Sequence, residues 1–162
     1  MEMAVTTLAR GHVRLVLCLH TSVDPPASEW ARSLAELSAL LQTTPATQHV
    51  RMLIVTGGGG PDAKQRAQLK DVWGDRSIKV AVLVPGHGNA LKRGLMTALS
   101  WLNPAMAFFL PNQLRDALAH LEQEQALEAV WEALSVMQKR LEPVRTLSLI
   151  AEASALPSPV GR

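Results

Sequence analysis

Short apolar segments alternate with segments of helical periodicity along most of this chain. The apolar segments have the length and the Val, Leu and Ile content of buried strands, and they cover residues 13–19, 50–56, 78–84 and 106–110. Between them, apolar side chains recur every three or four residues, as one face of a helix requires. Strands that alternate with helices of about 11–15 residues predict right-handed crossovers and a mainly parallel sheet.

The N-terminal segment predicts a β-hairpin ahead of these units. Residues 3–8 favour a strand, and Gly11 lies in a turn that leads into the strand at 13–19. The next helix has Ser28 as its predicted N-cap, and its apolar face consists of Trp30, Leu34, Leu37 and Leu41. The chain is therefore expected to form an α/β fold, with a four- to five-stranded, mainly parallel sheet and flanking helices.

A further helix is predicted after this α/β domain, which we assign to residues 1–122. Residues 123–142 form that helix, and residues 143–162, with three Pro or Gly near the end, are expected to be a loose tail. The helix carries an apolar stripe over residues 127–141, which includes Leu127, Leu134, Met137 and Leu141. The stripe is too short for a free coiled coil, so it packs either on the domain or on a second copy in a homodimer.

The composition argues against several classes of function. The formal net charge is only +2 and no run of basic residues occurs, so no nucleic-acid partner is expected. The longest apolar runs of about six to eight residues are far too short to span a bilayer, and no signal peptide is recognised, which predicts a cytoplasmic protein. The single cysteine excludes an internal disulfide, and no Cys/His set has metal spacing, so neither a metal nor a cofactor is expected.

Three stretches resemble the STAS domain, the fold of anti-sigma-factor antagonists, and more closely the bacterial STAS/SEC14-like proteins. They are the hairpin around Gly11, the strand at 52–56 with its glycine-rich turn, and LMTALSWLNPAMAFFLPNQLRDALAHL at 95–121. The resemblance covers residues 3–122. It implies a non-enzymatic regulatory module that docks on a protein partner, such as a kinase-type regulator. It also implies that Thr56 stands at the family's phosphoacceptor position, although the Asp of the family motif is absent here.

The sharpest local feature is a run of four glycines between a strand and a helix. Gly57, Gly58, Gly59 and Gly60 follow Thr56, and Pro61 and Asp62 open the next helix. Backbone N–H groups at such a turn can bind an anion, so one hypothesis is a binder of, or an enzyme on, a small phosphorylated or acidic ligand. The others are a partner-docking surface and a plain turn, since neither dinucleotide-binding nor P-loop spacing is present.

A second candidate group follows the third long strand. His87, Lys92 and Arg93 lie in and after the loop that begins at Pro85. Loops after parallel strands emerge at one edge of the sheet, so this group should neighbour the glycine run, with Asp24 joining from the loop after the hairpin. We interpret the set as a partner- or ligand-binding edge rather than a catalytic triad, because Thr56 is not in a nucleophile elbow.

Cys18 lies in an apolar run two residues before His20. The two side chains share one face of a strand, which is the one arrangement here that could activate a thiol. A buried, unreactive cysteine is the interpretation we favour.

Overall fold

The computed structural model describes residues 3–45, 47–85, 105–154 and 156, and within them the chain is an α/β protein with one five-stranded sheet. The elements are β1 (Met3–Arg10), β2 (Val13–His20), α1 (Ala27–Thr43), β3 (His49–Thr56), α2 (Ala63–Trp73), β4 (Lys79–Leu83), β5 (Met106–Phe109), η1 (Pro111–Gln113), α4 (Leu114–His120), η2 (Glu124–Ala126), α5 (Leu127–Gln138) and α6 (Arg145–Ser154).

The sheet follows the order of the sequence, β1-β2-β3-β4-β5. β1 and β2 form the expected antiparallel hairpin, whereas β2, β3, β4 and β5 are parallel. In register, one row of paired residues crosses the whole sheet through Val5, Cys18, Ile54, Val82 and Phe108. The α/β class and the mixed, mainly parallel sheet expected from the sequence are therefore confirmed.

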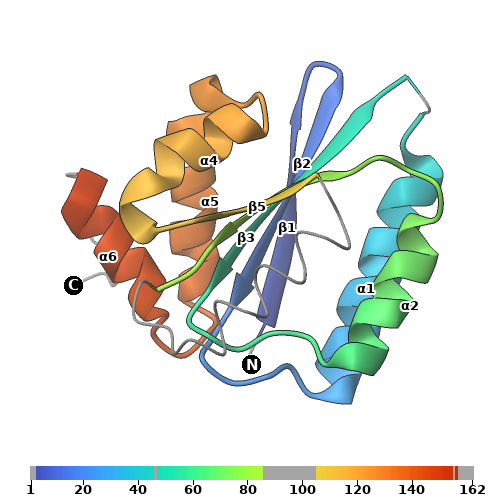
Figure 1. Ribbon diagram of the computed structural model, residues 1–162, viewed down its shortest axis with the longest axis horizontal. Coiled ribbons are helices and arrows are strands. Elements are labelled where there is room, and N and C mark those ends of the chain that lie inside the picture. Colours follow the sequence, from blue (N-terminus) through green and yellow to red (C-terminus); the bar gives the residue numbers. More distant parts are fainter. Residues whose placement is uncertain (1–2, 46, 86–104, 155, 157–162) are drawn as a thin grey trace.

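Helices cover both faces of the sheet (Figure 1). α1 connects β2 to β3 and α2 connects β3 to β4, and both lie on the same face, because right-handed crossovers between successive neighbouring strands stay on one side. α4, α5 and α6 lie on the opposite face. The helix predicted after Asn89 falls in residues 86–104, outside the residues that the structure describes.

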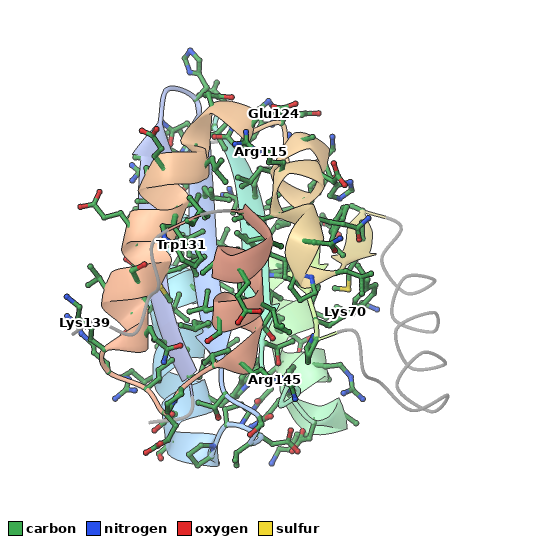
Figure 2. The ribbon with its side chains drawn as sticks, turned by 90° about the vertical axis from the view of Figure 1, so that its left-hand side faces the viewer. Lys70, Arg115, Glu124, Trp131, Lys139 and Arg145 are labelled. Atoms are coloured by element: carbon green, nitrogen blue, oxygen red, sulfur yellow. The ribbon has the colours of Figure 1, made fainter. Side chains whose placement is uncertain are left out.

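The face under α4, α5 and α6 holds the larger hydrophobic core (Figure 2). Alternate strand residues such as Leu17, Leu53 and Leu83 are fully buried there. From the helices, Leu118, Val130, Leu134, Leu147 and Ile150 complete it. The sequence left open whether the apolar stripe of α5 packs on the domain or on a second copy. In the structure it packs on the sheet of its own chain.

The prediction of a loose tail from residue 143 is wrong for most of that segment. Residues 145–154 form α6, in which Thr146, Leu147, Ile150 and Ala151 are buried. Three apolar side chains, Leu147, Ile150 and Ala151, follow helical spacing here, but the prolines at 157 and 159 favoured the interpretation as a tail. Since α6 shares a core with β2, β3 and β4, the C-terminal helices are part of the domain rather than an addition to it.

The helix starts on the other face differ from the sequence prediction by a residue or two. α1 begins after Pro26 rather than Ser28, and no side chain caps it. α2 begins after Asp62, whose carboxylate accepts a hydrogen bond from the backbone of Gln65, while the Gln65 side chain binds the backbone N–H of Asp62. This capping box fixes the direction in which α2 leaves the glycine run.

A buried arginine, Arg51, forms an ion pair at the edge of the sheet where the parallel strands begin. Arg51 donates to the carboxylate of Glu122 at 3.0 Å, and Lys79 binds its other oxygen. These two cations lower the pKa of Glu122 to about 2. The three residues tie the turn after α4 to β3 and β4.

Within the described chain, no helix has the length and apolar character needed to cross a membrane.

Candidate functional site

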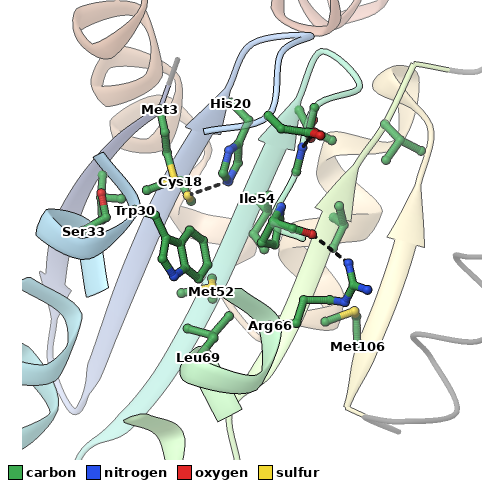
Figure 3. Close-up of a pocket in the computed structure, with 18 of the residues that line it drawn as sticks. Met3, Cys18, His20, Trp30, Ser33, Met52, Ile54, Arg66, Leu69 and Met106 are labelled. Carbon is green, nitrogen blue, oxygen red and sulfur yellow. Dashed lines mark hydrogen bonds between the residues drawn. The ribbon is translucent and has the colours of Figure 1, made fainter. Parts of the chain in front are cut away.

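A cavity of about 740 Å³ lies between the sheet and helices α1 and α2 (Figure 3). Its floor consists of the strand residues that point away from the larger core. They come from all five strands and are Met3, Val5, Val16, Cys18, His20, Met52, Ile54, Thr56, Val82, Met106 and Phe108. Two helices are too few to cover five strands, so part of this apolar face stays unfilled by the described residues.

The helical wall of the cavity is also apolar. α1 contributes Trp30, Leu34 and Leu37, and α2 contributes Leu69 and Trp73. Leu34, Leu69 and Trp73 are only partly buried, although their helical positions are those of core residues. The core face predicted for the first helix is confirmed for Trp30, Leu37 and Leu41, which are buried in hydrophobic clusters on this side of the sheet, and Leu34, Leu69 and Trp73 pack against these clusters while lining the cavity.

Three methionines line the cavity, Met3, Met52 and Met106. Methionine side chains are unbranched and polarisable, and they adjust to ligands of irregular shape. A fourth, Met137, is buried in the core on the opposite face of the sheet. Met3 and Met52 also belong to the hydrophobic clusters on this face, and Met106 packs against one of them.

The cavity reaches the edge of the sheet where the parallel strands end. We call this edge the carboxyl edge and this end of the cavity its mouth. The residues that line it there are Asp24, Gly58, Gly59, Gly60, Pro61, Asp62 and Arg66. Open α/β sheets bind their ligands at this edge. The location agrees with the edge that the sequence analysis singled out, whereas the cavity itself was not foreseen.

The backbone N–H groups of the glycine loop, residues 57–60, are all used inside the chain. Gly57 and Gly59 donate to the carbonyls of His20 and Thr21 at 2.9 and 3.1 Å. Gly58 donates to the hydroxyl of Thr56 and Gly60 to the carboxylate of Asp24, both at 3.0 Å. The loop therefore presents no backbone donor to an anion in this conformation.

Close packing explains Gly57 and Gly59, and backbone conformation explains Gly58. At Gly57 a Cβ atom would lie 3.0 Å from the backbone of Thr21 and Ser22. Gly58 has a positive φ of 125°, which glycine adopts without strain. At Gly59, a Cβ atom would collide with the backbone of Val23. At Gly60 a Cβ atom would meet nothing within 4 Å. The glycines thus let the loop lie against residues 21–24.

Thr56, the residue at the predicted phosphoacceptor position, is 7% exposed. Its hydroxyl donates to the carbonyl of Gly59 and accepts from the N–H of Gly58. Its own carbonyl accepts a hydrogen bond from Thr146 of α6 at 2.6 Å. A kinase would reach this hydroxyl only after the loop had opened, so phosphorylation of Thr56 stays a prediction.

His20 and Cys18 lie side by side on the cavity floor, with Nε2 and Sγ 3.3 Å apart. Burial raises the pKa of the Cys18 thiol to about 12 and lowers the pKa of His20 to about 4, although Asp24 acts in the opposite direction on the histidine. Both groups are neutral near pH 7. This order of pKa values is the reverse of what a thiolate–imidazolium pair needs, and it favours the unreactive cysteine of the sequence analysis.

Of the second predicted group, Asp24 joins the glycine loop as expected, through its bond to Gly60. His87, Lys92 and Arg93 lie outside the described residues. Among the residues that are described, no cluster of His, Cys, Asp and Glu could hold a metal ion.

The sequence interpretation places Ser33 on the outer face of its helix, and this prediction is wrong, because Ser33 is 8% exposed and lines the cavity. Its spacing is the signal that could have found it: Ser33 lies three residues after Trp30 and four before Leu37, on the same side of the helix.

Comparison of the chain with protein-family models, with curated proteins and with solved structures found no match.

Proposed function

We propose that this protein binds a small apolar molecule in the cavity between the sheet and helices α1 and α2. One observation carries the proposal: a space of about 740 Å³, lined mainly by apolar side chains, extends to the carboxyl edge. Ligand sites in proteins have volumes of about 300–1,000 Å³, mostly apolar walls and a few polar groups. Such a site serves binding, transport or sensing, and no enzymatic role is proposed.

The size of the space supports a ligand rather than a packing defect. Protein interiors are packed as densely as organic crystals, and voids larger than a water molecule are few. An empty apolar cavity also costs stability in proportion to its volume. A domain with an apolar space of this volume would gain stability if side chains filled it, unless the space serves an occupant.

The glycine loop supports an apolar ligand better than the phosphorylated or acidic ligand that the sequence analysis considered. Its four N–H groups already have partners, and one of them is the Asp24 carboxylate, which occupies the place of an anion. A phosphate would have to displace it. The loop then serves to shape the mouth of the cavity.

Titration with the neutral fluorescent dye N-phenyl-1-naphthylamine tests the proposal. We expect saturable binding to one site, and its loss in Ile54→Trp, which fills the centre of the cavity floor. Val136→Trp, at a position 49% exposed on α5, is the matched control and should bind like the wild type. Absence of binding to the wild-type chain would contradict the proposal.

A second candidate function is the partner docking that the STAS resemblance implies. Val23 and Leu110 favour it, because these exposed apolar side chains follow β2 and β5 at the carboxyl edge. Capture of partners from a cell extract should then fail for Val23→Asp and Leu110→Asp. Equal recovery of every partner by these variants and the wild type would count against docking at this edge.

A further inference from the structure

The charges around the cavity restrict what its ligand can be. The charged side chains among the described lining residues are Asp24, Asp62 and Arg66, all at the mouth. Each is already engaged: Asp24 accepts from Gly60, Asp62 accepts from Gln65, and Arg66 donates to the carbonyl of Pro61 at 2.7 Å. Two carboxylates against one guanidinium do not favour an anionic ligand.

The polar groups farther inside are uncharged. They are the Ser33 and Thr56 hydroxyls, the Cys18 thiol, the His20 imidazole and the indole N–H groups of Trp30 and Trp73. Among them, Nδ1 of His20 and Nε1 of Trp73 are buried without a hydrogen-bond partner in the described chain. A charged group placed beside them would lose its hydration without gaining a counter-ion, which is costly. A hydroxyl or carbonyl oxygen loses far less, and one hydrogen bond compensates for the loss.

His20 lacks a hydrogen bond that such an oxygen can supply. Nδ1 of His20 is buried and has no partner among the described residues, while Nε2 contacts only the Cys18 sulfur, a weak partner (Figure 3). Nδ1 is covered when the cavity is empty, so a bond to a ligand requires the imidazole to turn about its Cβ–Cγ bond. The weak contact with sulfur opposes this turn little.

We propose that the ligand is an uncharged molecule with a hydrocarbon body and a hydroxyl or carbonyl oxygen that hydrogen-bonds to the His20 imidazole. This inference rests on the proposed function and narrows it to a class, the lipid-like alcohols and ketones. It excludes fatty acids and phosphorylated lipids as the preferred ligands.

Displacement of the bound dye by four ten-carbon probes tests the inference. 1-Decanol and 2-decanone should displace the dye at concentrations at least about tenfold lower than decanoate and decyl phosphate. If the dye binds but the four probes compete equally, or the acids compete better, the inference is overturned while the proposed function stands. If the dye does not bind at all, the proposed function itself has failed.

Variants of His20 test the assignment of the oxygen. His20→Phe should weaken 1-decanol about three- to tenfold relative to any change in the affinity for the dye. His20→Asn keeps a hydrogen-bonding group near the position of Nδ1 and should restore part of the preference. Ser38→Ala, on α1 but outside the cavity, is the control. A loss of preference in Ser33→Ala, with none in His20→Phe, would overturn the assignment.

Discussion

At the scale of the residue, the cavity floor combines apolar side chains with a histidine that folding keeps neutral. Burial lowers the pKa of His20 from 6.5 to about 4, so the folded chain resists a proton that the unfolded chain accepts. Between these two pH values the unfolded state binds more protons, and stability falls as the pH falls. His20 therefore makes the protein sensitive to mild acid.

The first prediction concerns this sensitivity. The free energy of unfolding of the wild type should drop between pH 6.5 and pH 4, with a contribution from His20 on the order of 3 kcal/mol. His20→Phe should flatten the profile in this window, as measured by urea unfolding at several pH values. His12→Phe, in the exposed hairpin turn, is the control, and an equal flattening by this variant would contradict the assignment.

Two neighbouring glycines give a second prediction at this scale. Gly59→Ala should lower the free energy of unfolding by about 1–3 kcal/mol, because the new methyl group meets the Val23 backbone, which cannot easily move. Gly60→Ala has free space and should change stability by less than about 0.5 kcal/mol. Thermal unfolding of the two variants decides the point, and equal stabilities would show that the loop is not packed as described.

At the scale of the element, α6 connects the C-terminal segment to the site. It buries Leu147 and Ile150 in the larger core, and Thr146 binds the carbonyl of Thr56 at the start of the glycine loop. The glycine loop is thus anchored at two points, by Thr146 of α6 at its start and by Asp24 at its end. A segment expected to be a loose tail is part of what positions the mouth of the cavity.

Truncation tests the role of this helix. A chain that ends at residue 142 should lose at least about 3 kcal/mol of stability, since it no longer buries Leu147 and Ile150. A chain that ends at residue 156 keeps α6 and should unfold at nearly the same urea concentration as the full chain. If both truncated chains were as stable as the full one, α6 would not belong to the folded domain.

At the scale of the whole molecule, the sequence predicts the sheet well and the site poorly. The strands could be read because continuous apolar runs mark strands buried on both faces, and their order follows from the intervening helices. The cavity could not be predicted from the sequence, because the apolar periodicity that includes Ile54 and Leu69 is the same whether these side chains contact each other or line a cavity. The partners of the glycine loop were also hidden, since Thr21 and Asp24 precede it by more than thirty residues.

The two faces of the sheet differ in a way that makes the central claim directly measurable. Met3, Met52 and Met106 line the cavity, whereas Met137 is buried in the core on the other side. The methyl group of each of these four methionines therefore reports on one face. Labelling with [methyl-¹³C]methionine places these reporters without changing the protein.

NMR spectra of the labelled chain, recorded while N-phenyl-1-naphthylamine is added, test whether an apolar molecule enters the cavity. The methyl resonances of Met3, Met52 and Met106 should shift together and saturate at one equivalent, and that of Met137 should stay in place. Shifts confined to Met137, or saturable binding that leaves the three cavity methionines unchanged, would contradict the account.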